Sequence, residues 1–340
     1  MIDIMSYTEE ECVAYAVAKG ESGYRGKQLF GWFRKGITSF DEMKNIPRGL
    51  CDIIKNECLL AGCAAVKTQI SSDGTRKYLF RLHDGEMIES VFMKYIHGNT
   101  VCVSTQAGCR MGCVFCASTI NGLKRNLYPS EMLSQITEIQ KDTGERVSNV
   151  VLMGMGEPLD NYENVIKFLR LLNCEKGLNI GYRHVSLSTC GLTDKMERLA
   201  DEGLPVTLSV SLHAPNGNAR KQLMPIANKY GYDELLKTCV EYEKKTKRRV
   251  SFEYALISGV NDRQTDAHEL GKRLKGTLCH VNLIPLNQTE RKVYKSSEKS
   301  HIETFTNILE SYKITVTVRR SLGGDISAAC GQLKAETADG

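Results

Sequence analysis

The chain has 340 residues, of which 41% are hydrophobic and 25% are charged. This composition is typical of globular proteins and excludes disordered and collagen-like classes, while the length allows about two domains or one barrel-sized domain. The 45 basic and 40 acidic residues leave a net charge of +5, which does not by itself establish a nucleic-acid partner.

The 13 cysteines are the most informative part of the composition. The N-terminal stretch is acidic where a signal peptide would be basic, and no run reaches the about 18 apolar residues of a membrane span. We therefore expect a soluble, cytoplasmic protein without a membrane partner. In such a reducing compartment an odd number of cysteines favours metal or redox chemistry over a disulfide framework.

Residues 1–60 are predicted to form a helical domain that docks RNA. The stretch from Tyr24 to Gly36 places Leu29, Phe30 and Phe33 on one helix face. Basic side chains beside Trp32 could contact phosphate, although a solvated helix face would show the same pattern. These basic residues are Arg25, Lys27, Arg34 and Lys35.

Residues 61–98 are predicted to form a short β-rich extension. Two Asp-Gly pairs, at residues 73–74 and 84–85, separate runs typical of strands and indicate hairpin turns. A boundary is expected near Gly98.

From residue 99 to residue 320, short apolar runs alternate with stretches of helical period. This order is typical of βα units around a parallel sheet, and six such units predict an α/β fold, a partial (β/α)6 TIM-type barrel. One more strand follows, and residues 321–340 are predicted to form a glycine-rich C-terminal loop. The strand candidates are VCVST, NVVLMG, HVSLST, PVTLSVSLH, RVSFEYALI and HVNLIPL.

Directly after the first of these strands, Cys109, Cys113 and Cys116 form a C-x3-C-x2-C array. Thiolates so close in sequence can converge on one metal centre. A structural zinc site would need a fourth ligand, and no further Cys or His lies nearby. A 4Fe-4S cluster held by three cysteines has one iron left to bind a small molecule.

The array resembles that of the radical S-adenosylmethionine (SAM) superfamily, which implies that SAM chelates this iron. Polar residues follow the later strands, at the edge of the barrel where ligands bind. Among them, Gly156 follows the second strand and permits close backbone approach, and Glu157 beside it can accept from the SAM ammonium. The other residues implied to bind SAM are Ser188, Ser211, Leu212, His213 and Asn287.

Two further cysteines narrow the chemistry. Cys102 lies between two valines, so that it points into the barrel if they face the helices. Cys330 lies in the glycine-rich loop, and either residue could instead be a buried core thiol.

Together, the motifs QLFGWFRKG, VCVSTQAGCRMGCVFC, GMGEPL, LSTCG, SLHAP, VNLIPLN and DISAACGQL closely resemble the RlmN family of adenine-C2 methyltransferases, from about Tyr24 to Leu333. The sister family Cfr, which methylates C8, typically has alanine where this chain has Pro158. One departure is Cys190, where the RlmN family usually has a smaller or aliphatic residue.

The resemblance implies that Cys330 takes a methyl group from one SAM and becomes S-methylcysteine. A radical from a second SAM then abstracts hydrogen from this methyl, and its carbon adds to adenine C2. Cys102 resolves the adduct by forming a disulfide with Cys330, which external thiols reduce. Glu89 matches a family glutamate assigned as proton acceptor or adenine contact, and a surface strand carboxylate is the alternative.

The implied substrates are an adenosine in the peptidyl transferase centre of 23S rRNA and one beside the tRNA anticodon. The implied partners also include an electron donor such as flavodoxin, and we expect a monomer. Two alternatives stay open at this point: C8 methylation by the same mechanism, and an RNA-binding protein with a structural metal site.

Overall fold

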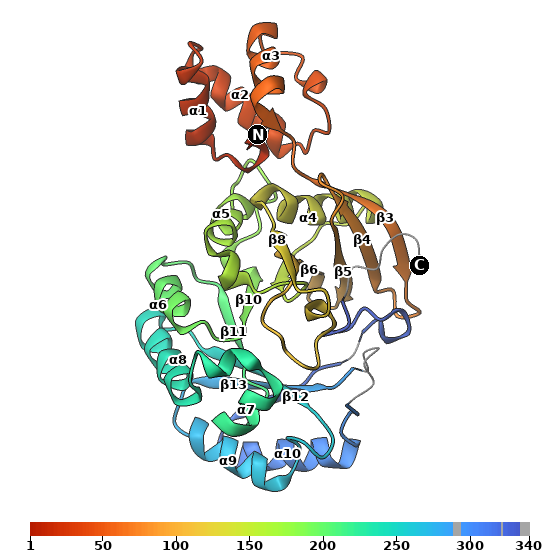
Figure 1. Cartoon of the computed structure of the whole chain (residues 1–340), viewed down its shortest axis with the longest axis vertical. Helices are drawn as coiled ribbons and strands as arrows, with labels where there is room; N and C mark the ends of the chain where they lie inside the picture. The colour runs from red at the N-terminus through yellow and green to blue at the C-terminus, as the bar shows by residue number, and fades with distance from the viewer. Residues whose placement is uncertain (288–293, 321, 334–340) are drawn as a thin grey trace.

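The computed structural model describes residues 1–287, 294–320 and 322–333. Within these ranges, one ten-stranded sheet runs through the molecule in the order β14-β13-β12-β11-β10-β9-β6-β5-β4-β3 (Figure 1). Its parallel part consists of β6 (Gly98–Cys102), β9 (Asn149–Leu152), β10 (Val185–Thr189), β11 (Thr207–Ser211), β12 (Val250–Leu256), β13 (Cys279–Pro285) and β14 (Thr315–Val318).

Each connection between neighbouring parallel strands carries at least one helix. The helices are α4 (Pro129–Thr143), α5 (Tyr162–Leu172), α6 (Thr193–Asp201), α7 (Gly217–Leu223), α8 (Tyr232–Thr246), α9 (Gln264–Leu274) and α10 (Lys299–Ser311). The order of the described strands leaves β14 and β3 as the two edges, so the predicted partial (β/α)6 barrel is confirmed. The longest helices, α4 and α8, have 15 residues, and within the described ranges none is long and apolar enough to cross a membrane.

Side-chain alternation explains why the barrel interior is polar. In β10, Val185, Leu187 and Thr189 are buried, whereas Ser186 and Ser188 between them are half-buried. Successive strand residues point to opposite faces, so the apolar set packs against the helices while the serines face the interior.

Three antiparallel strands extend the same sheet: β3 (Cys63–Ile70), β4 (Arg76–Leu82) and β5 (Met87–Tyr95). Gly74 and Gly85 have φ of 83° and 90° at the two hairpin turns, as expected of glycine there. The pairing of β5 with β6 places Val91 opposite Cys102. Side chains of β5 therefore lie beside the barrel interior, and the division of the chain near Gly98 stays a prediction.

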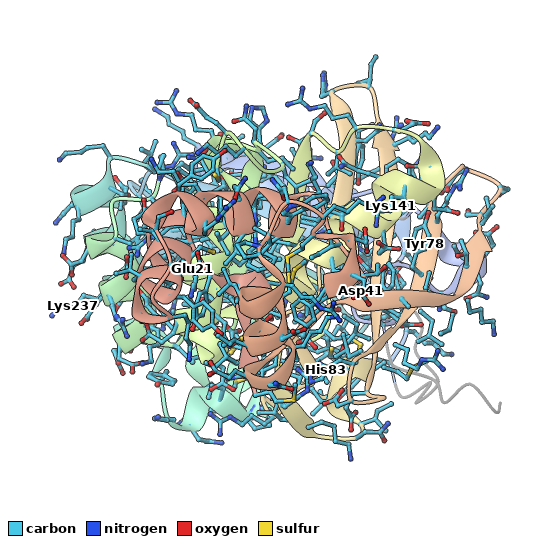
Figure 2. The ribbon with its side chains drawn as sticks, turned by 90° about the horizontal axis from the view of Figure 1, so that it is seen from above. Glu21, Asp41, Tyr78, His83, Lys141 and Lys237 are labelled. Atoms are coloured by element: carbon cyan, nitrogen blue, oxygen red, sulfur yellow. The ribbon has the colours of Figure 1, made fainter. Side chains whose placement is uncertain are left out.

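The N-terminal part contains α1 (Glu9–Ala18), α2 (Gly23–Arg34) and α3 (Arg48–Glu57), with β1 (Ile2–Asp3) pairing β2 (Cys58–Leu59). The predicted helix face is confirmed, because Leu29, Phe30 and Phe33 are buried. Trp32 donates through Nε1 to Asn45 Oδ1 at 2.6 Å, and Lys35 lies 4.4 Å from the centre of its ring. Viewed from above these helices, nitrogen- and oxygen-tipped side chains are spread around the whole periphery (Figure 2).

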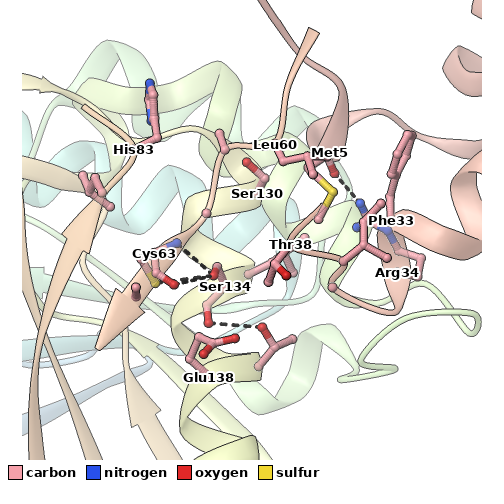
Figure 3. Close-up of a pocket in the computed structure, with 18 of the residues that line it drawn as sticks. Met5, Phe33, Arg34, Thr38, Leu60, Cys63, His83, Ser130, Ser134 and Glu138 are labelled. Atoms are coloured by element: carbon pink, nitrogen blue, oxygen red, sulfur yellow. Dashed lines mark hydrogen bonds between the residues drawn. The ribbon is translucent and has the colours of Figure 1, made fainter. Parts of the chain in front are cut away.

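Arg34 is not placed to contact RNA. Its guanidinium is largely buried, donates to the Met5 carbonyl, and has an Nε without a partner. It lines a cavity of about 290 Å³ between α2 and α4, where the Cys63 N–H also donates to Ser134 Oγ at 3.0 Å (Figure 3). Of the four predicted phosphate contacts in this domain, Arg25, Lys27 and Lys35 therefore remain candidates.

Candidate active site

The three cysteines of the array lie on the loop between β7 (Gln106–Gly108) and β8 (Leu123–Asn126). Two backbone features close the neck of this loop. The Cys109 N–H donates to the Gly122 carbonyl at 3.1 Å, and Gly108, with φ of 75°, lies so close that an added Cβ would be 1.9 Å from that oxygen. Only glycine fits at position 108. We call residues 109–122 the cysteine loop.

The thiols of Cys109, Cys113 and Cys116 line one cavity of about 160 Å³. Burial raises the pKa of Cys109 to about 12 and that of Cys113 well above its ordinary value, and Cys116 adds to both rises. Without metal these two are neutral thiols, and binding iron would release their protons. Within the described ranges no three such groups converge on a single ion. A cluster does not require this, because each thiolate binds a different iron.

The GMGE segment after β9 packs against the chain from the end of β6 to the first residue of β7. A Cβ at Gly154 would be 2.7 Å from the Ser104 nitrogen, and one at Gly156 would be 2.6 Å from the Gln106 Cβ. The Met155 N–H donates to Ser104 Oγ at 2.9 Å. Both glycines are therefore required by packing within the chain, in addition to any approach to SAM.

Glu157 is buried and lines the same cavity. Oε1 accepts from the Leu159 N–H at 3.0 Å, and Oε2 accepts from the Cys190 N–H at 2.7 Å. Burial raises the pKa of this carboxyl, and the two hydrogen bonds oppose the rise. Each carboxylate oxygen can accept more than one hydrogen bond, so an ammonium group can still be bound here.

Four of the other predicted SAM residues line this cavity: Ser188, Ser211, His213 and Asn287. Leu212 differs, because it is fully buried and its N–H donates to the Glu253 carbonyl at 3.0 Å.

His213 has φ of 54°, and its Nδ1 accepts from the Ala255 N–H at 2.9 Å. Burial lowers its pKa to about 3, so the ring is neutral and carries its proton on Nε2.

A second cavity joins the first. Cys102 and Cys330 both line it, together with Tyr95. Five residues line both cavities: Met153, Ile284, Asn287, Arg319 and Cys330. Burial raises the pKa of Cys102 to about 12, Cys330 adds to the rise, and Arg319 opposes it. All 13 cysteines are free thiols here, so the disulfide between Cys102 and Cys330 stays a prediction for one step of a reaction cycle.

Residues 322–333, which we call the carrier loop, are held from two sides. On one side, the Gly323 N–H donates to Asp73 Oδ2 at 2.9 Å, and Ser71 donates to Asp325 at 2.5 Å. On the other side, the Ala117 N–H of the cysteine loop donates to the Gly331 carbonyl at 2.8 Å. Ser118 beside it donates to the Leu333 carbonyl at 2.7 Å. The carrier loop therefore bridges the β3–β4 turn and the cysteine loop.

Comparison with known proteins agrees with this geometry. The Radical SAM superfamily matches residues 103–270. A probable dual-specificity RNA methyltransferase RlmN from Clostridium botulinum is 52% identical over 335 residues, which cover 98% of this chain and 96% of the relative. One from Alkaliphilus oremlandii is 53% identical over 334 residues, covering 98% and 97%. The chain belongs to the RlmN family.

The crystal structure of a radical SAM methyltransferase from Sphaerobacter thermophilus superposes with a TM-score of 0.92 at 42% identity, covering 99% of this chain and 100% of that one. The predicted family and fold are thus confirmed, and the cofactors of the RlmN family are a 4Fe-4S cluster and SAM. The roles of individual residues stay predictions.

Glu89 is buried in β5, where the Lys77 Nζ lies 3.2 Å from its Oε1. It shares a sheet face with Val91, which pairs with Cys102, because side chains two residues apart point the same way. Glu89 is therefore on the Cys102 side of the sheet, although it does not line either of the two cavities among the described residues. The alternative that Glu89 is a surface carboxylate on a strand is wrong, because its side chain is buried.

Sequence reasoning missed two charged residues of this RlmN site, Glu253 and Arg319. Arg319 directly follows β14, and its Nη1 lies 3.5 Å from the Met153 sulfur. Cys330 raises the pKa of Arg319, with a further contribution from Glu253. The sequence did contain signals for both residues. Arg319 follows a strand, as the predicted SAM residues do, and Glu253 is a lone carboxylate in the apolar run of β12.

Replacing Gly108 with alanine is expected to open the neck of the cysteine loop, because the methyl group cannot share space with the Gly122 carbonyl. We expect a loss of about 3 kcal/mol in the free energy of unfolding, as for severe backbone strain, and loss of most bound iron. Gly122→Ala is the matched control, since its φ of 64° strains alanine but leaves open space around it. Urea unfolding and iron analysis measure both effects. Full iron content in Gly108→Ala would contradict this account.

Proposed function

We propose that this enzyme methylates C2 of an adenosine in 23S rRNA and of an adenosine beside the tRNA anticodon. The relatives are named dual-specificity RNA methyltransferases. The observation that carries the proposal is that Cys102 and Cys330 line one cavity, which shares five lining residues with the cavity of the cysteine loop. A carrier thiol and a resolving thiol need this arrangement.

Adenine C2 lies between two ring nitrogens and is electron-poor, so it does not act as a nucleophile toward SAM. When bound at Cys109, Cys113 and Cys116, the cluster supplies the electron that cleaves SAM to a carbon radical. The proposed role of Cys330 is to hold the methyl carbon on its sulfur, so that this carbon is transferred to C2. Its place in the wall between both cavities supports this role.

Release of the product requires a base and a second sulfur. In this proposal the radical adduct first loses one electron, for which the oxidised cluster would be the acceptor, and the Glu89 carboxylate accepts the proton from adenine C2. The Cys102 sulfur then bonds to the Cys330 sulfur as the carbon–sulfur bond breaks, and a proton from solvent completes the methyl group. Cys102 is a neutral thiol at rest because of its burial. Arg319 opposes that effect and so favours the attacking thiolate.

Glu157, Ser188, Ser211, His213 and Asn287 are proposed to hold SAM. The buried Glu157 carboxylate suits an ammonium group, and the neutral His213 can donate from Nε2. Gly156 and Leu212 would contribute through their backbones. The electron donor, such as a flavodoxin, the monomeric state and the cytoplasmic location belong to the same proposal.

Methylation of C8 is the rival within this chemistry, and Pro158 in GMGEP favours C2. The expected result is 2-methyladenosine in digests of protein-free 23S rRNA and of tRNA after incubation with the loaded enzyme, SAM and a reductant. Mass spectrometry with chromatographic standards separates the two isomers. The appearance of 8-methyladenosine would instead assign the Cfr-like reaction, and no methylation of either RNA would favour an RNA-binding protein with a structural metal site.

Cys102→Ala is expected to trap RNA on the protein, because the carbon–sulfur bond to Cys330 can form but cannot be resolved. A denaturing gel with labelled RNA would show a retarded band. Cys330→Ala should give no such band and no methylation, since the carrier is missing. Cys239→Ala, at a buried thiol of α8, serves as the control and should turn over like the parent enzyme. Normal methylation by Cys330→Ala would remove this residue from the mechanism.

Glu89→Gln is expected to lower RNA methylation by about 100-fold, the lower range for loss of a general base. Formation of 5'-deoxyadenosine should persist, because the cysteine loop and SAM site are untouched. Quantifying both products in the same reaction separates these effects. Glu145→Gln, which removes the carboxylate of the exposed ion pair with Lys94, is the control. Unchanged methylation in Glu89→Gln would reject the proposed role.

A further inference from the structure

Arg220 in α7 is an arginine with no exposed surface. Its Nη2 donates to the Cys190 carbonyl at 2.5 Å and to the Ser211 carbonyl at 3.2 Å. Its Nε and Nη1 are buried without a hydrogen-bond partner. Within the part of the chain that the structure describes, no carboxylate forms an ion pair with this guanidinium.

A buried cation without a counter-charge is strongly unfavourable. Neutralisation does not relieve it, because a guanidinium stays protonated even where burial lowers its pKa, as it does for Arg220. The two unpartnered nitrogens therefore point to an anion that the polypeptide itself does not supply.

The surroundings of Arg220 indicate which anion this is. The C-terminal end of α7 packs on the cysteine loop, where the Val114 N–H donates to the Leu223 carbonyl at 3.1 Å. The carbonyl that Arg220 holds belongs to Cys190, which lines the same cavity as Cys113. Arg220 itself does not line this cavity, so its guanidinium lies behind the part of the wall that Cys190 forms.

We propose that Arg220 is the buried counter-charge of the iron–sulfur cluster and sets its reduction potential. An oxidised 4Fe-4S core with three thiolates carries one net negative charge, and one electron from the donor raises this to two, with no bond made or broken. A fixed cation nearby stabilises the second state more than the first, and local charge and hydrogen bonds are known to tune such potentials. Arg220 would therefore act on electron uptake through the cluster, without touching substrate or SAM. This inference rests on the proposed cluster site.

The test measures the midpoint potential of the reconstituted, SAM-free enzyme by titration with dithionite, followed by the electron paramagnetic resonance signal of the reduced cluster. Arg220→Gln is expected to lower the equilibrium constant for reduction at least about tenfold, which is about 59 mV for one electron. Arg220→Lys keeps the charge and should stay within a threefold change. A purely structural arginine would alter stability in both variants without separating their potentials.

Arg34→Gln is the matched control. Arg34 is also a largely buried arginine with an unpartnered Nε, but it lies in α2 at the top of Figure 1, whereas α7 lies in the lower half of the molecule. It should leave the potential unchanged.

Iron and sulfide analysis separates the two levels of the proposal. A parent enzyme without a cluster would refute the cluster site itself. A loaded Arg220→Gln with the parent potential would overturn only the role of Arg220. If Arg220→Gln does not fold, Arg220→Lys decides, since a tenfold shift despite the retained charge would contradict the inference.

Discussion

Closure of the cysteine loop by the Cys109–Gly122 hydrogen bond is the constraint on which the rest of the site depends. The same loop bonds to α7 through Val114 and to the carrier loop through Ala117 and Ser118. One short segment of backbone therefore positions three groups relative to one another. These are the cluster thiols, the buried Arg220, and the thiol proposed to carry the methyl group. Three of these hydrogen bonds join backbone atoms and the fourth uses the Ser118 hydroxyl, so that positions are fixed without using the thiols that the chemistry needs.

The site keeps its charges in places from which water is excluded, where each charge acts over a longer range. Burial raises the pKa of Cys102, Cys109 and Cys113, so these thiols stay unreactive until iron or a cation stabilises the thiolate. Two arginines differ in their relation to the joined cavities. Arg319 lines both of them together with Cys330, whereas Arg220 lines neither and holds the carbonyl of Cys190 in the wall. The proposed steps of electron uptake and adduct resolution therefore have separate cations.

The parallel strands could be predicted because each is a short β-branched run, and their common carboxyl edge brings Glu157, Ser188, Ser211 and His213 into one cavity. What could not be predicted is contact between segments distant in sequence. Arg34 looked like a surface cation beside an apolar face, yet its guanidinium is enclosed by the chain around Met5. The burial of Arg220 could not be predicted either, because a basic residue in a short helix after SLHAP carries no sequence signal of burial. Its proposed role follows only from the groups that surround it in the folded chain.

The antiparallel extension shows why the site needs more than a barrel. The barrel alone would leave β6 at an edge, with Cys102 beside solvent, and the pairing of β5 with β6 covers that edge. The β3–β4 turn then reaches the carrier loop through Asp73, whose pKa is held at about 2 by hydrogen bonds such as that from Gly323, although burial acts in the opposite direction. The Asp73 carboxylate stays charged at any physiological pH, so its hydrogen bond with the Gly323 N–H does not depend on pH in that range. The antiparallel extension thus covers Cys102, the proposed resolving thiol, and fixes the carrier loop that holds Cys330. Both effects depend on one sheet being continuous from β3 to β14.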